Sequence, residues 1–159
     1  MNFKQNHICI LLSFCLLTLI FSFTTQSQSI RQKHFNIDNG VAIEGYDPVA
    51  YHVSGKATKG NKQFAVNADG VIYHCSNKTN KELLIANYKK YEPQYGGWCA
   101  YAMGNSGEKV KINPQTFKIK DGKLYLFYNA LFNNTLNSWN ENETTLKNSA
   151  DKNWTKIFK

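Results

Sequence analysis

The sequence predicts a small single α+β domain, in which two β-hairpins form an antiparallel sheet that packs against two to three helices. Two alternating stretches, 62–75 and 116–128, predict the hairpins, because each is interrupted by a turn signal that contains Asp-Gly. Apolar residues at helical spacing over 78–91, and apolar anchors in the tail 130–158, predict the helices. No internal repeat and no long linker divides the chain.

The stretch GYDPVAY, residues 45–51, opens the globular pattern. Asp47 precedes Pro48, an arrangement that caps or shapes a turn. Residues 49–53 alternate well enough for a short strand, and we expect that strand to end at the turn signal Ser54-Gly55.

Further along, Ser76 and Asn77 are placed to cap the helix over 78–91. The second hairpin is expected to turn at Asp121-Gly122. The tail 130–158 is expected to form one or two helices, with its apolar residues among polar, Asn-rich neighbours.

Residues 1–29 are predicted to be a secretory signal peptide. An uncharged apolar stretch, 8–23, follows a polar start with Lys4, and small residues precede the expected cleavage point. The stretch is shorter than the roughly 20 residues that a spanning helix needs. We therefore expect export to the periplasm or the extracellular space, a loose N-terminal arm over 30–44, and the domain itself over 45–159.

The chain is basic, with a formal net charge of +8 at pH 7, and loss of Lys4 with the signal would leave +7. The lysines are spread along the chain, without the dense basic run and interleaved aromatics that nucleic-acid binding requires. We expect a solvated basic surface and no nucleic-acid partner. Contact with membranes is expected only through the signal sequence or as a peripheral encounter.

Cysteine counting focuses attention on two residues. Removal of the signal takes away Cys9 and Cys15, and leaves Cys75 and Cys99 without a C-x-x-C pair. A zinc knuckle and a thioredoxin-type motif are therefore excluded. The sequence also contains no Gly-rich phosphate loop, G-x-S-x-G or H-E-x-x-H motif, so an enzyme is not the favoured hypothesis.

Four segments, taken together and in order, resemble the exported branch of the YHS-domain family over residues 45–154. They are GYDPVAY (45–51), YHCS (73–76), YEPQYGGWCAYAM (91–103) and DGKLYLFYN (121–129). Proteins with this layout are YHS domain-containing proteins, and some carry selenocysteine at the position that matches Cys99.

The resemblance implies metal binding or thiol chemistry, because YHS domains are similar to cysteine-rich modules proposed to bind heavy metals. This chain lacks the family's CGM element, and Cys75 stands where phenylalanine is commoner. The resemblance therefore points to Cys99 more than to a complete metal site.

Cys99 is the centre of the predicted site. The backbone of Gly96-Gly97 can approach a ligand closely, and free N–H groups of a following helical turn would favour a thiolate. Met103 lies four residues on, so a helix would put its thioether on the same face, and thiolate plus thioether suits copper(I). His74 and Cys75 point to opposite faces of a strand, so only one of them can join Cys99.

Three hypotheses stay open at this stage. The preferred one is a domain that binds a soft metal ion, copper(I) above others, through Cys99 with Met103 and either His74 or Cys75, in exchange with a metal-handling protein. The second is a thiol-redox protein with Cys99 as its reactive thiolate and His74 as a base. The third is a structural or interaction domain with a Cys75–Cys99 disulfide.

An aromatic neighbourhood surrounds Cys99 in the sequence. Its side chains either line a pocket around the thiol or belong to the core, and they are Tyr73, Tyr91, Tyr95, Trp98 and Tyr101.

Overall fold

The computed structural model describes residues 30–158, so the predicted signal peptide over 1–29 lies outside the described residues. Over 30–158 the chain forms short helices and four antiparallel two-stranded sheets, which confirms the α+β class. The strands are β1 (Ile37–Asp38), β2 (Val41–Ala42), β3 (Ala65–Ala68), β4 (Val71–His74), β5 (Asn113–Lys120), β6 (Lys123–Phe127), β7 (Asn129–Ala130) and β8 (Asn133–Asn134). The α-helices are α2 (Pro48–Val53), α3 (Lys78–Ala86), α4 (Tyr88–Tyr91), α5 (Ala100–Asn105), α6 (Thr135–Glu141) and α7 (Glu143–Ile157), with 3-10 turns η1 (Ile43–Gly45), η2 (Lys62–Phe64) and η3 (Gln94–Gly97).

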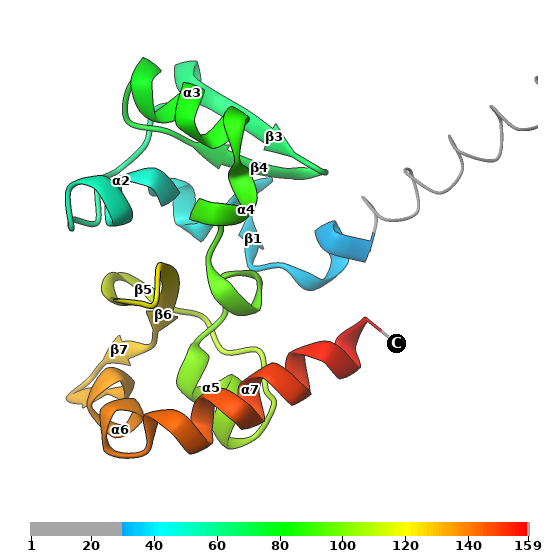
Figure 1. Ribbon diagram of the computed structural model, residues 1–159, viewed down its shortest axis with the longest axis vertical. Coiled ribbons are helices and arrows are strands. Elements are labelled where there is room, and N and C mark those ends of the chain that lie inside the picture. Colours follow the sequence, from blue (N-terminus) through cyan, green and yellow to red (C-terminus); the bar gives the residue numbers. More distant parts are fainter. Residues whose placement is uncertain (1–29, 159) are drawn as a thin grey trace, which may run out of the picture.

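The elements fall into two neighbouring groups (Figure 1). The β3–β4 hairpin lies in the upper part of the figure with α2, α3 and α4, and the lower part holds α5, α6 and α7. The β5–β6 hairpin lies between the groups in this view. None of the helices within 30–158 is both long and apolar enough to cross a membrane.

Both predicted hairpins are present. Their turns place Asp69 and Asp121 at φ 48° and 51°, each followed by a glycine at positive φ, which is the backbone that an Asp-Gly hairpin turn requires. Contrary to our expectation, the two hairpins do not form one sheet: each is a separate two-stranded sheet. Isolated parallel bridges, Pro93 with Leu124 and Cys99 with Leu126, connect β6 to the intervening segment instead.

Residues 49–53 are helical, so the expected strand there is wrong. Asp47 is the N-cap of α2, and its carboxylate accepts hydrogen bonds from the backbone N–H groups of Val49 (2.9 Å) and Ala50 (3.3 Å). Pro48 follows at the first helical position, where its fixed φ suits a helix. This helix start signal outweighs the weak alternation that predicted a strand. The alternation also fails in the structure, because the consecutive residues Val49, Ala50 and Tyr51 are all buried.

The same carboxylate joins α2 to two other elements. Asp47 is fully buried, and its second oxygen accepts from the backbone N–H and the hydroxyl of Ser76, both at 2.7 Å. That oxygen also accepts from the side-chain amide of Asn80 in α3 at 2.6 Å. Five donors therefore surround one buried carboxylate, which ties GYDPVAY to YHCS and to the helix that follows it.

The predicted loose arm over 30–44 is packed against the domain, and this expectation is corrected. Phe35, Asn36 and Ile43 are buried, and the Asn36 backbone N–H donates to the Gly96 carbonyl at 2.9 Å. The β1–β2 hairpin within this segment gives it secondary structure of its own. The buried apolar side chains of the segment, Phe35, Ala42 and Ile43, belong to the larger core cluster and hold it against the domain.

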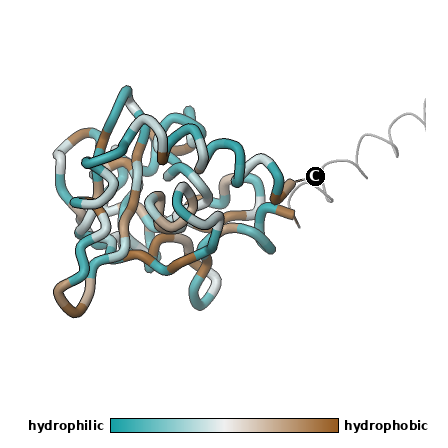
Figure 2. The backbone as a smooth tube through the Cα atoms, turned by 90° about the horizontal axis from the view of Figure 1, so that it is seen from below, coloured by the Kyte–Doolittle hydropathy of each residue, from teal (hydrophilic) through white to brown (hydrophobic). Residues whose placement is uncertain are grey.

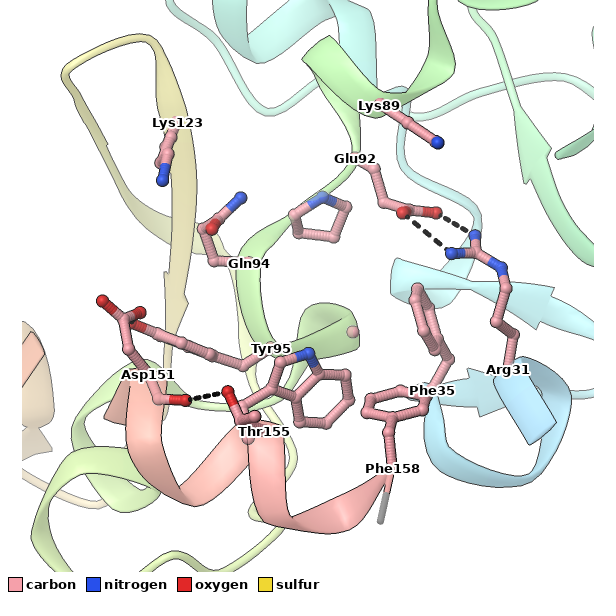
Figure 3. Close-up of a pocket in the computed structure, with 13 residues that line it drawn as sticks. Arg31, Phe35, Lys89, Glu92, Gln94, Tyr95, Lys123, Asp151, Thr155 and Phe158 are labelled. Atoms are coloured by element: carbon pink, nitrogen blue, oxygen red, sulfur yellow. Dashed lines mark hydrogen bonds and ion pairs between the residues drawn. The ribbon is translucent and has the colours of Figure 1, made fainter. Parts of the chain in front are cut away.

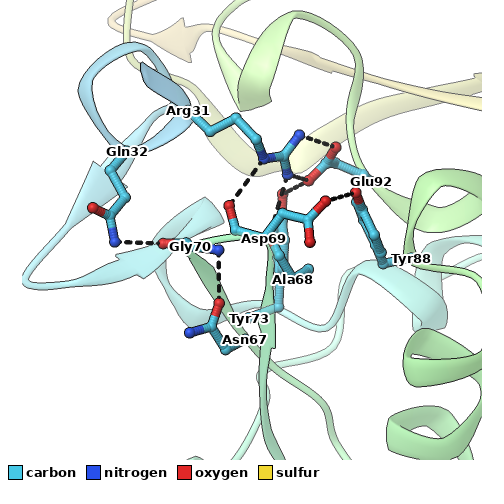
Figure 4. Close-up of polar contacts among 9 residues, drawn as sticks. All are labelled: Arg31, Gln32, Asn67, Ala68, Asp69, Gly70, Tyr73, Tyr88 and Glu92. Atoms are coloured by element: carbon cyan, nitrogen blue, oxygen red, sulfur yellow. Dashed lines mark hydrogen bonds and ion pairs between the residues drawn. The ribbon is translucent and has the colours of Figure 1, made fainter. Parts of the chain in front are cut away.

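Arg31 fixes the start of this segment (Figure 4). Its guanidinium bonds to Glu92 at 2.6 Å and to the backbone carbonyls of Ala68 and Asp69. Glu92 also accepts from the buried Tyr73 hydroxyl at 2.8 Å. Burial and the neighbouring Glu92 carboxylate raise the pKa of Tyr73 well above its usual value, so this hydroxyl stays protonated as a donor.

The core consists of two contiguous clusters. The larger one packs the β3–β4 hairpin, α2 and α3 against the arm, with Tyr51, Tyr73 and Leu84 fully buried. The second cluster surrounds Trp139 of α6, whose ring lies 5.7 Å from Tyr125 and 5.6 Å from Phe127. The tail therefore forms two helices, within the expected range, and their aromatic anchor is buried under β6.

Candidate binding site

Cys99, the centre of the predicted site, is a buried residue between elements. It is the N-cap of α5, its side chain is fully inaccessible, and its backbone N–H donates to the Val110 carbonyl at 3.0 Å. The bridge to Leu126 aligns it with β6. These contacts make Cys99 part of the packed interior.

The Cys99 thiol closes a ring of hydrogen bonds. Its Sγ accepts from the backbone N–H of Tyr128 at 3.3 Å and lies 3.4 Å from Thr135 Oγ1. Thr135 donates its single hydroxyl proton to the Tyr128 carbonyl at 2.8 Å, so the thiol is the donor toward Thr135. These contacts connect the start of α5, the end of β6 and the start of α6 through the Cys99 side chain.

The structure shows which face of β4 is buried, a question that the sequence left open. Tyr73 and Cys75 are buried, whereas Ile72 is exposed and His74 is half-buried. Burial, together with the Asp47 carboxylate, raises the pKa of Cys75 to about 12. Cys75 is therefore a neutral core thiol, and His74 lies on the other face of the strand.

Met103 is the remaining predicted ligand. It is fully buried in α5, and its backbone N–H donates to the Cys99 carbonyl at 3.0 Å, so the two residues lie one helical turn apart, as their spacing predicts. Residues 30–158 contain no group of three or more His, Cys, Asp or Glu side chains arranged to hold a metal ion. The hydrogen-bond partners of the Cys99 Sγ are Tyr128 and Thr135, and its side chain is fully buried, so soft-metal binding stays a prediction from the sequence.

The disulfide alternative also differs from the structure. Cys75 and Cys99 are both free and both buried, so no bond joins them. They are held as separate thiols, one at the end of β4 and one at the start of α5.

We predict that both thiols are protected from reagents in the native chain. Alkylation at pH 8 should proceed at least about 100-fold more slowly than in denaturant, because a buried neutral thiol must first be exposed by opening of the structure. Mass spectrometry of iodoacetamide-treated chain, native and unfolded, measures this. Rapid native labelling of Cys99, or stoichiometric retention of copper(I) that Cys99→Ser abolishes, would restore the thiol or metal hypothesis.

Histidine burial predicts a pH dependence of stability. The pKa of His52 is lowered, chiefly by burial and then by Lys90, and its Nε2 is buried without a hydrogen-bond partner among residues 30–158. The pKa values of His34 and His74 are also lowered, by burial and nearby lysines. The unfolded chain thus binds more protons than the folded chain below about pH 6.5.

The free energy of unfolding should therefore have its full value above about pH 6.5. It should fall as the pH drops from there toward the pKa values of the histidines in the folded chain. His52 should contribute most, because solvent screens the other two side chains. Urea unfolding at pH 7.5 and pH 5.5 measures the loss, and His52→Gln should reduce it. An identical pH dependence in His52→Gln would contradict this assignment.

A pocket of about 430 Å³ lies away from Cys99, where four distant segments meet (Figure 3). One wall is the N-terminal segment with Arg31 and Phe35, and another is the chain over 89–96. Lys123 at the start of β6 and the last turns of α7 complete it. Its volume is within the usual range for small-molecule sites.

The floor of the pocket is aromatic. Trp154 packs edge-on against Phe35, with ring centroids 5.9 Å apart, and against Phe158 at 5.1 Å. Gly96 lies beneath these rings, and a Cβ there would stand 2.7 Å from Trp154 Cη2. The Gly-Gly pair thus permits a close approach between backbone and rings.

The same wall contains an aromatic residue with a left-handed backbone. Tyr95 and Gly96 are consecutive left-handed residues, with φ 55° and 59°. Tyr95 is held there because its ring is buried and its hydroxyl donates to Asp151 of α7 at 2.9 Å. A bulky residue in this conformation persists only where its surroundings fix it, and such residues are concentrated at functional sites.

The rim of the pocket carries unbalanced positive charge. Arg31 is neutralised by Glu92, and Asp151 is paired with Lys147 at 2.8 Å. Within the described residues, no salt bridge involves Lys89 or Lys123. Figure 3 shows both lysines and Gln94 at one end of the pocket, with Phe35 and Phe158 at the other.

Sequence reasoning found part of this wall and missed the rest. Tyr95 is expected either to line a pocket around Cys99 or to lie in the core. It lies in the core, in the cluster around Trp139, and it also lines a pocket, although not one around Cys99. The Gly-Gly pair beside it was the available signal. Arg31, Trp154 and the two rim lysines carried no local motif, because they meet only through tertiary packing.

Comparison with known proteins adds no relative: no protein-family model, no curated protein and no solved structure matches the chain. The resemblance to the YHS-domain family therefore stays a prediction from the four segments of the sequence.

Proposed function

We propose that this chain is an exported binding module rather than an enzyme, and that its ligand is a small organic anion with a flat apolar part. The observation that carries the proposal is the left-handed Tyr95, which with Gly96 forms part of one wall of the 430 Å³ pocket. The secretory signal predicted over 1–29 supports a periplasmic or extracellular location.

Two features of the pocket specify the ligand class. The floor of Phe35, Trp154 and Phe158 offers edges and faces on which a flat ring can pack. Lys89 and Lys123 supply exposed ammonium groups at the rim without a carboxylate partner, and so favour an anionic group on the ligand. Cys99 takes no part in binding, since its thiol is committed to Tyr128 and Thr135.

Nuclear magnetic resonance titrations with phenyl phosphate, benzoate and neutral benzamide test the proposal. Both anions should shift the indole N–H signal of Trp154, and benzamide should bind more weakly. Lys89→Gln/Lys123→Gln should weaken anion binding up to about thirtyfold, because each of the two exposed charge contacts contributes less than about 1 kcal/mol.

A matched double variant, Lys56→Gln/Lys62→Gln, removes the same charge from exposed positions outside the pocket. It should bind the anions like the unmodified chain. Equal losses in the two double variants, equal binding of benzamide, or no shift of Trp154 would each contradict the proposal.

A further inference from the structure

The loop between β7 and β8 exposes two large apolar side chains. Leu131 is 89% exposed and Phe132 110% exposed, the highest values among the exposed large hydrophobic residues. Figure 2 shows this loop as a hydrophobic projection from the molecule. Single exposed leucines are common on protein surfaces and need no explanation. An adjacent, exposed Leu-Phe pair at the tip of a projecting hairpin is unusual and does need one.

The backbone of the loop is also unfavourable for these residues. Leu131 and Phe132 have φ 50° and 69°, so both central positions of the turn are left-handed. Asn and Gly usually occupy such positions, and here Asn133 and Asn134 stand just beyond the turn. The chain therefore presents two apolar side chains where a polar turn would be more stable.

The size of the tip indicates what covers it. A buried phenylalanine contributes about 150–250 Å². Even if the leucine buries as much, the area that the two side chains can bury stays well below the roughly 800 Å² per partner of a stable protein interface. A lipid interface needs no matching surface and accepts single apolar side chains that insert between headgroups.

Charge favours an anionic lipid surface in particular. The chain carries a formal net charge of +8, or +7 without the predicted signal, and Lys111 lines a shallow pocket with Glu44, Asn129 and Ala130 at the base of the loop. Its only ion-pair contact within the described residues, to Asp38, is long at 3.7 Å and exposed, so it leaves the lysine available. Basic residues near a membrane attract anionic headgroups.

We infer that the Leu131–Phe132 tip docks the protein on an anionic membrane, by insertion of both side chains into the lipid interface. This site is separate from the proposed ligand pocket and does not depend on it. The inferred contact is peripheral, with the tip inserted and the basic surface facing the headgroups.

Vesicle experiments on the full chain test the inference. An environment-sensitive nitrobenzoxadiazole label is placed at the tip through Phe132→Cys, and at the exposed Ile85 of α3 through Ile85→Cys as the control. Cys9→Ser and Cys15→Ser remove the two thiols of the predicted signal in every labelled chain, and the burial of Cys75 and Cys99 then limits labelling to the introduced cysteine. With vesicles of phosphatidylglycerol and phosphatidylcholine, the label at 132 should shift to the blue and brighten, whereas the label at 85 should not change.

A second variant separates insertion from folding. Leu131→Asn/Phe132→Gly supplies the residues that the left-handed turn prefers, so the fold should be at least as stable. Its binding to the same vesicles should fall at least tenfold, with the N-terminal 29 residues identical in both chains. An unchanged label at 132, or vesicle binding equal to that of the unmodified chain, would overturn the inference and leave only protein docking or surface charge to explain the tip.

Discussion

Asp47→Asn is expected to lower the free energy of unfolding by about 3–5 kcal/mol, a large share of the stability of a domain this size. The Asp47 carboxylate is fully buried and accepts from five donors in α2, Ser76 and Asn80. An amide has one oxygen, so either orientation directs its N–H donors at other donors. Urea unfolding followed by circular dichroism measures the loss.

The matched control is Asp38→Asn, which makes the same chemical change at an exposed aspartate with two long contacts, to Lys111 at 3.7 Å and to Asn39 at 3.4 Å. It should change the free energy of unfolding by less than about 0.5 kcal/mol. If Asp47→Asn costs no more than this control, the carboxylate is not the hub that joins GYDPVAY to YHCS and α3.

The parts of the fold that the sequence could predict are those marked by a local motif, such as a turn or a helix cap. Asp-Gly identifies both hairpin turns, because few residue pairs tolerate two left-handed positions. Asp47-Pro48 was recognised as a cap or turn, but its consequence, a helix over Pro48–Val53, was obscured by apparent alternation. Alternation distinguishes a strand only when one face is exposed, and here three consecutive residues are buried.

Cys99 shows why the site was harder to predict than the fold. The sequence singled it out by its neighbours and by the family resemblance, and the expected partners were other soft ligands. Its partners are the Tyr128 backbone and the Thr135 hydroxyl, 29 and 36 residues away, and neither has a pattern that marks it as a thiol partner. The packed arm was missed for a similar reason, since Phe35 and Ile43 find their contacts only in the folded chain.

The Gly-Gly segment beside Cys99 provides the second large prediction. Gly96→Ala should lower the free energy of unfolding by about 2–4 kcal/mol and abolish binding in the proposed pocket. A left-handed alanine costs about 1 kcal/mol or more, and its Cβ would stand 2.7 Å from Trp154 Cη2 and 3.0 Å from Phe35 Cγ. The rings must move apart, and with them the floor on which the ligand would pack.

Gly55→Ala separates the two contributions. Gly55 has nearly the same backbone as Gly96, φ 62° against 59°, but no atom lies within 4 Å of the added Cβ. It should therefore show the conformational cost alone, about 1–2 kcal/mol, and leave ligand binding unchanged. Urea unfolding and the phenyl phosphate titration on both variants give the comparison. Equal destabilisation would mean that the aromatic floor yields freely, and that the close approach of Gly96 to Trp154 does not shape the pocket.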